Sequence, residues 1–91
     1  MSAKKKIENE TALKNALNIL KQVSESSSTP RNIRKTLKAV TDMLTDTSAS
    51  IGIRAANAIS MLDDISQDPN MPSFARVTIW SGVSELENIR E

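Results

Sequence analysis

The sequence of 91 residues contains no cysteine and no histidine. Without cysteine, a fold held by disulfides, a thiolate nucleophile and a zinc site built on thiolates are all excluded. Without histidine, the chain also lacks the commonest general base near neutral pH and the commonest transition-metal ligand. An enzyme of this composition would have to work with carboxylates, lysine, serine or threonine. We therefore expect a protein that is not an enzyme and that uses no metal or cofactor.

Glycine and aromatic residues are almost as scarce, since Gly52, Gly82, Phe74 and Trp80 are the whole set. A fold rich in strands or loops would need more glycines for positive φ, and strands usually bring more aromatic residues. The larger apolar residues are instead Ile, Leu, Val and Met, which pack readily between helices. This composition predicts an all-α fold.

Long apolar runs are missing too. None approaches the roughly 20 apolar residues that cross a bilayer, and residues 1–6 lead into polar sequence rather than the apolar core of a signal peptide. We expect a cytoplasmic protein with no membrane contact. The length leaves room for one hydrophobic core, which predicts a single helical domain over residues 1–91, with residues 1–6 frayed.

The formal net charge is only +1, but the charges are unevenly distributed along the chain. Residues 1–40 hold nine lysines and arginines against three acidic residues, whereas residues 41–91 hold three against eight. The first half therefore carries +6 and the second half −5. A basic first half is suited to contact with a polyanion.

Apolar residues recur at the three- and four-residue spacing of one helical face along most of the chain. Pro30 suits the first turn of a helix, which makes Thr29 its expected N-cap, and Ser48 or Ser50 is the expected cap of the next helix. Together these signals predict four helices, over residues 7–24, 30–45, 51–66 and 73–89.

The second half of the chain repeats the apolar pattern of the first after an ungapped shift of 42 residues. Leu20 falls on Leu62, and the helix-starting Pro30 falls on Pro72. Two such units are fewer than the three or so that an open solenoid needs. The sequence therefore predicts a four-helix bundle built from two similar helical hairpins. The third helix has the broadest apolar stripe, including Ile53, so we expect it to be the most buried.

Three runs stand in a fixed order along the chain: Thr29-Pro30-Arg31-Asn32-Ile33-Arg34, Arg54-Ala55-Ala56-Asn57-Ala58-Ile59, and Asp68-Pro69-Asn70-Met71-Pro72 followed by Arg76 and Ile79-Trp80. With these runs the chain resembles the archaeal uncharacterised protein family 0147 over most of its length after Leu13. The resemblance implies a helical, cytoplasmic, archaeal protein of unknown function. In the family pattern a His commonly stands where this chain has Phe74, and a Lys where it has Thr78.

The second helix carries a basic stripe, because four cations fall within an arc of roughly 100° on the side away from Leu37. The stripe consists of Arg31, Arg34, Lys35 and Lys38. Such a stripe can contact the phosphates of RNA or DNA without reading bases. It is also typical of a solvated helix face, balanced here by acidic neighbours such as Asp42. Both interpretations remain open at this point, as does contact with a partner protein.

The fourth helix has two apolar faces. Phe74 and Val77 point away from Ile79 and Val83, with Trp80 between the two faces. Either the first turn of this helix reaches across the other hairpin, or Phe74, Val77 and Trp80 form a contact surface. A symmetric homodimer would hide such a surface against its own copy.

Three carboxylates near the end of the third helix could be imagined as a Mg²⁺ site, and these are Asp63, Asp64 and Asp68. The favoured alternatives are ion pairs with Arg34, Arg54 or Arg76, or simply exposed carboxylates, because neighbouring carboxylates on a helix point in different directions. Arg54 and Asn57 lie in an alanine-rich apolar helix, where we expect a structural role.

The sequence therefore favours a non-enzymatic helical protein-interaction module that associates with itself and binds a protein partner through its helix faces. A nucleic-acid-associated protein, for example one bound to ribosomal RNA through the basic stripe, is the alternative.

Overall fold

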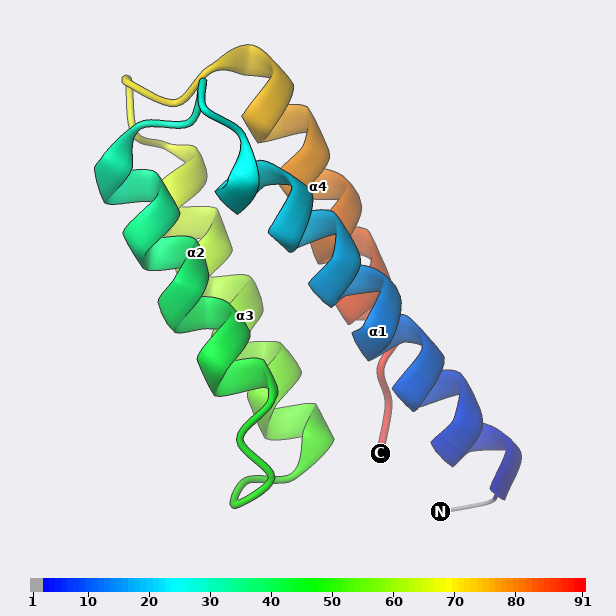
Figure 1. The fold of residues 1–91 in the computed structure, drawn as a ribbon. Helices are drawn as coiled ribbons and strands as arrows, with labels where there is room; N and C mark the ends of the chain where they lie inside the picture. The colour runs from blue at the N-terminus through cyan, green and yellow to red at the C-terminus, as the bar shows by residue number, and fades with distance from the viewer. Residues whose placement is uncertain (1–2) are drawn as a thin grey trace.

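The computed structural model describes residues 3–91 and contains four α-helices and no strand within that range (Figure 1). The helices are α1 (Ala3–Glu25), α2 (Arg31–Leu44), α3 (Ile51–Ser66) and α4 (Ser73–Glu87). The predicted all-α fold is confirmed. α1 begins at Ala3, so residues 3–6 are helical where fraying was expected, and residues 1–2 lie outside the described range. α4 ends at Glu87, two residues before its predicted end.

Each helix packs against two others, so the helices form the corners of a square bundle of 41 × 21 × 20 Å (Figure 1). α1 packs against α2 and most extensively against α4, while α3 packs against the other sides of α2 and α4. α2 and α4 therefore lie on opposite corners. The expectation that the third helix is the most buried is wrong, because α3 buries four of its 16 residues whereas α4 buries five of its 15. Ile53 of α3 is 56% exposed.

The core lies between the helices and is formed by the apolar face that each helix turns inward. Burying each of the larger side chains contributes about 1.5–3 kcal/mol. Gly82 lies where α1 comes close to α4, since a Cβ at Gly82 would lie 3.3 Å from Leu20 Cδ2. The fully buried aliphatic side chains come from all four helices: Leu20, Val23, Ile33, Leu37, Val40, Leu44, Leu62, Ile79 and Leu86.

The buried positions follow the 42-residue repeat of the sequence. Every buried residue from Ala16 to Leu44 has a buried counterpart 42 positions later. Pro30 and Pro72 are the N-cap residues of α2 and α4, with similar backbone angles (φ −56°, ψ 149° and φ −61°, ψ 149°). The superposition of the two hairpins as three-dimensional units stays a prediction.

Two of the predicted caps have different outcomes. Thr29 is not the N-cap of α2, because Pro30 occupies that place and the helix begins one residue later than expected. The buried Thr29 hydroxyl instead donates a hydrogen bond of 2.7 Å to the Val23 carbonyl, near the end of α1. Ser50 is the cap of α3, since its Oγ accepts a hydrogen bond of 3.4 Å from the Ile53 N–H.

At the end of the bundle that holds the α2–α3 connection (Figure 1), two carboxylates accept hydrogen bonds from backbone N–H groups. Glu91 Oε1 accepts a hydrogen bond of 2.9 Å from the Gly52 N–H, and this bond together with one from Ser50 lowers the pKa of Glu91. Hydrogen bonds from the Ser48 hydroxyl and N–H lower the pKa of Asp46 in the same way. These carboxylates therefore have partners within the chain.

Candidate functional site

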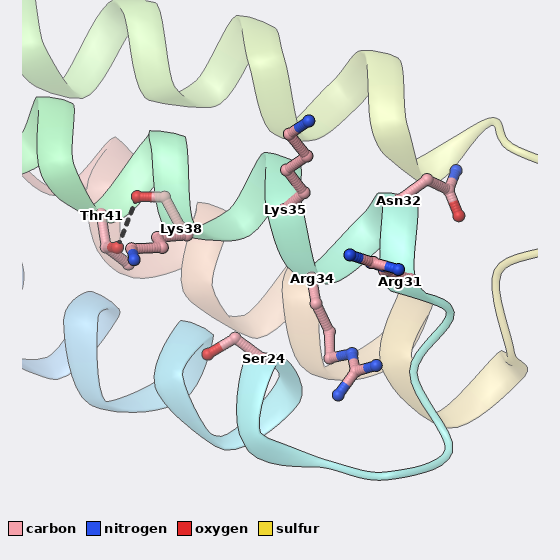
Figure 2. Close-up of a pocket in the computed structure, with 7 residues that line it drawn as sticks. All are labelled: Ser24, Arg31, Asn32, Arg34, Lys35, Lys38 and Thr41. Atoms are coloured by element: carbon pink, nitrogen blue, oxygen red, sulfur yellow. Dashed lines mark hydrogen bonds between the residues drawn. The ribbon is translucent and has the colours of Figure 1, made fainter.

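An open groove of about 970 Å³ lies between the end of α1 and the outer side of α2 (Figure 2). We call it the basic groove, because all four members of the predicted basic stripe line it. Three polar residues that the sequence pattern did not single out also contribute. Ser24 could have been predicted only from the α1–α2 hairpin, which brings the end of α1 beside the start of α2. The lining consists of Ser24, Arg31, Asn32, Arg34, Lys35, Lys38 and Thr41.

No carboxylate lines the basic groove. The one ion pair within 4.0 Å among residues 3–91 joins Lys21 and Glu25 on α1. The four cations of the groove are exposed, and within the same range their side chains make no ion pair or hydrogen bond. The groove therefore presents four positive charges to solvent without an internal partner.

α2 holds these cations outward because its opposite face is fixed in the core. Ile33 and Leu37 are fully buried, and their spacing sets the rotation of the helix about its own axis. Figure 2 shows Arg34 extending on the side of α1, where Ser24 lies, while Lys35 extends toward the other side. The positive charge therefore spans the width of the groove.

Two of the remaining arginines are structural. Arg54 Nη1 donates a hydrogen bond of 2.7 Å to the carbonyl of Leu44, the last residue of α2. Arg76 Nε donates one of 2.9 Å to the carbonyl of Ser66, the last residue of α3. The expected structural role of Arg54 is therefore what the contacts show, whereas Asn57 is exposed.

The second candidate surface lies on α4. Phe74, Val77 and Trp80 are 44%, 63% and 52% exposed, so the first turn of α4 does not bury its outer apolar face. We call these three residues the apolar face. The other exposed positions of this helix up to Ser84 are serines, and the charged residue in this stretch is the half-buried Arg76.

The apolar face and the basic groove occupy equivalent positions in the 42-residue repeat. Phe74, Val77 and Trp80 are the counterparts of Asn32, Lys35 and Lys38. Because α2 and α4 lie on opposite corners, the two surfaces face away from each other. The bundle therefore presents one basic and one uncharged apolar surface at matching places.

The acidic residues at the end of α3 do not gather around one point. Asp63 and Asp64 are exposed, and no group of three potential metal ligands lies together among residues 3–91. Asp68 accepts hydrogen bonds from Asn32 Nδ2 at 3.1 Å and from the Asn70 N–H at 2.8 Å. The expected ion pairs with arginine are not formed in this range, because Arg76 Nη2 reaches the Asp68 carbonyl, at 3.4 Å, and not its carboxylate.

No helix within residues 3–91 combines the length and the apolar character that crossing a bilayer requires. The structure thus offers two surfaces, the basic groove and the apolar face, as candidates for contact with other molecules.

Several archaeal proteins are similar to this chain. A UPF0147 protein of Metallosphaera sedula is 49% identical over 84 residues, which are 92% of this chain and 94% of the relative. One of Desulfurococcus amylolyticus is 38% identical over the full length of both chains.

Two crystal structures are similar to this bundle. MMP1188, a protein of unknown function, matches with a TM-score of 0.83 and 42% identity over 88% of this chain and 91% of its own. A UPF0147 protein from Thermoplasma acidophilum matches with a TM-score of 0.85 and 26% identity, over 91% of this chain and 98% of its own. The sequence matches the uncharacterised protein family UPF0147 over residues 1–89. The chain belongs to this family.

Proposed function

We propose that this protein is a non-enzymatic helical binding module that holds the phosphate backbone of a nucleic acid in the basic groove. The observation that carries the proposal is a groove lined by four cations and no carboxylate. Binding of a phosphate backbone draws its free energy mainly from the release of counterions when Lys and Arg neutralise phosphates. A groove whose cations have no internal partner is available for this exchange.

The layout of the cations fits an extended polymer better than a small anion. Arg31 and Lys38 are seven residues apart on α2, which corresponds to about 10 Å along the helix axis. Neighbouring phosphates along one strand can therefore meet successive cations. No aromatic residue lines the groove, so base stacking does not contribute there. The proposal accordingly specifies contact with the backbone and no sequence preference.

The test is a titration of a fluorescein-labelled 20-base-pair RNA duplex, followed by anisotropy at several salt concentrations. If three or four phosphates are neutralised, the logarithm of the binding constant should fall with the logarithm of salt with a slope of about −2.7 to −3.6. Replacing Arg31, Arg34, Lys35 and Lys38 together by Gln should abolish most of this binding and leave the helix content unchanged.

A matched control removes four other exposed charges, by replacing Lys4, Lys6, Lys14 and Arg90 with Gln. Both variants have the same net charge, so a general charge effect would weaken them equally. Binding should survive in the control. Equal loss in the two variants, or no binding by the parent at 50 mM salt, would contradict the proposal.

Self-association through the apolar face is a second candidate, because three large apolar side chains are exposed on one helix. The occupant that we propose is a second copy of this chain. The fully exposed positions of α4 carry no charge up to Ser84, so they can meet their own copies in a two-fold dimer with little like-charge repulsion. The equivalent surface of α2 could not do so.

Sedimentation equilibrium checks this second candidate. A dimer is expected at micromolar concentration, and the double substitution Phe74→Ser and Val77→Ser should give a folded monomer. A parent that stays monomeric up to high concentration, or a double variant that unfolds, would show that the apolar face does not join two copies.

A further inference from the structure

An arginine is the fourth residue of three of the four helices: Arg34 in α2, Arg54 in α3 and Arg76 in α4. Arg54 and Arg76 each donate to a carbonyl ten residues earlier, at the end of the preceding helix. The corresponding residue for Arg34 is Ser24, which lines the basic groove with it. Arg34 has the same position in its helix, yet its guanidinium makes no hydrogen bond among residues 3–91.

The ends of α1 and α3 differ in the side chain that is bonded to them. Thr29 is 2% exposed, and its hydroxyl donates to the Val23 carbonyl in the last turns of α1. The repeat counterpart of Thr29 is Met71, which has no hydroxyl, and the corresponding end of α3 receives Arg76. The first hairpin thus closes the end of its first helix with a threonine. Arg34, the counterpart of Arg76, makes no hydrogen bond to the end of α1.

We propose that Arg34 grips one phosphodiester group of a nucleic-acid duplex directly, through two parallel N–H···O bonds. This inference rests on the proposed function. It specifies which residue binds the phosphate and that the nucleic acid is a duplex. A guanidinium matches two phosphate oxygens with a rigid fork of donors, whereas a lysine ammonium acts as a point charge. Arg34 also extends toward the α1 side of the groove, where Ser24 lies (Figure 2). Lys35 and Lys38 then neutralise neighbouring phosphates.

The duplex is the occupant because its strands present phosphates at fixed spacing and require no stacking partner. A single strand would gain affinity from aromatic side chains, and the groove lining has none. The 20-base-pair RNA duplex should therefore bind at least as tightly as a 20-nucleotide single strand. Single-strand binding more than about tenfold tighter would overturn the duplex assignment.

Four single substitutions at exposed positions test the role of Arg34. Arg34→Lys keeps the charge, so the salt slope should stay unchanged while the dissociation constant of the duplex rises about five- to tenfold. Arg34→Gln should weaken binding further. Lys38→Gln should reduce the salt slope by about 0.9, and Lys38→Arg should change the dissociation constant by less than about twofold.

A direct readout comes from the side-chain Nε–H signals of ¹⁵N-labelled protein. The Arg34 signal, identified by its loss in Arg34→Lys, should shift when the RNA duplex is added, whereas those of Arg54 and Arg76 should not. If the parent fails to bind, the proposed function fails with this inference. If the parent binds but Arg34→Lys equals it within about twofold, or the Arg34 signal does not shift, the groove stands and the role of Arg34 is overturned.

Discussion

The outer surfaces of α2 and α4 are the most informative pair of regions in this molecule. They occupy the same positions in the 42-residue repeat, and both helices begin after an N-cap proline. One presents Asn32, Lys35 and Lys38, and the other presents Phe74, Val77 and Trp80. Their inward faces remain alike, since Leu37 and Ile79 are both fully buried.

This difference shows which positions of a helical repeat can change without changing the fold. Inward positions must fill the space between neighbouring helices, so they stay buried and apolar, although their size differs where that space differs, as between Val40 and Gly82. Outward positions carry no such requirement, and single substitutions there usually change stability by less than about 0.5 kcal/mol. One hairpin can therefore become basic and the other apolar without change of fold, which gives a small domain two outer surfaces of different chemical character.

Because both hairpins bury apolar side chains in the core, matching core substitutions should lower the free energy of unfolding by similar amounts. Leu37→Ala and Ile79→Ala should each lower the free energy of unfolding by about 2–5 kcal/mol, because both delete buried methyl groups and leave a cavity. Urea denaturation followed by circular dichroism measures this. The exposed Lys14→Ala is the control and should have little effect. A loss below about 1 kcal/mol at either core position would show that the hairpins do not share one cooperative core.

Substitutions of Arg34 and Arg76, which occupy matching positions of the repeat, should lower the free energy of unfolding by different amounts. Arg76→Gln should destabilise the protein by about 1–3 kcal/mol, because hydrogen bonds from a charged donor to two carbonyls at the end of α3 are lost. Arg34→Gln should change stability by less than about 0.5 kcal/mol, since its guanidinium is exposed and has no such bonds. The same urea titration compares them. Equal losses would mean that Arg34 also stabilises the fold, which would contradict its assignment to phosphate binding.

Much of this architecture could be predicted from the sequence, because helical periodicity and proline positions depend on local spacing. The four helices, the buried partners of the repeat and the outward position of Lys35 follow from that spacing alone. The roles of Thr29 and Arg76 could not be predicted, since each depends on a carbonyl of another segment that folding brings near. The α1 side of the basic groove was missed for the same reason, as Ser24 joins it only through the hairpin.

Exchanging the two outer surfaces should change contacts far more than stability. Replacing Phe74, Val77 and Trp80 with Asn, Lys and Lys places the α2 residues at three positions of α4, and the product should be a monomer. Its duplex binding should rise only a little, because Ser73 stands where α2 has Arg31 and Arg76 stays bonded to the Ser66 carbonyl. The free energy of unfolding should change by less than about 1 kcal/mol, because all three positions are exposed. Sedimentation and duplex titration measure the two effects.

The reverse exchange replaces Asn32, Lys35 and Lys38 with Phe, Val and Trp. It should weaken duplex binding and increase self-association, because two surfaces of each molecule are then apolar. Unchanged duplex binding would separate these positions from the phosphate contact. An unchanged sedimentation profile in both exchanges would remove the apolar face as an association surface.

The smallest expected effect concerns the N-terminal ends of α1 and α3, the first helices of the two hairpins. α1 extends to Ala3, past residue 9, which is the repeat counterpart of the start of α3. α3 begins at Ile51, and Glu91 closes its first turn through the Gly52 N–H. Because the folded pKa of Glu91 lies below its ordinary value of 4.5, this contact adds stability above pH 4.5. That contribution should disappear as the pH falls through the folded pKa.

Glu91→Gln isolates this contribution. The difference in free energy of unfolding between parent and variant should be small, constant from pH 7 to pH 5, and should shrink below about pH 4.5 as the carboxylate becomes protonated in the parent. Glu87→Gln is the matched control, since the Glu87 side chain is exposed at the end of α4 and makes no hydrogen bond among residues 3–91. Urea titrations at each pH give both differences. A Glu91→Gln difference that grows as the pH falls would have the wrong sign, and the carboxylate would then not stabilise the start of α3.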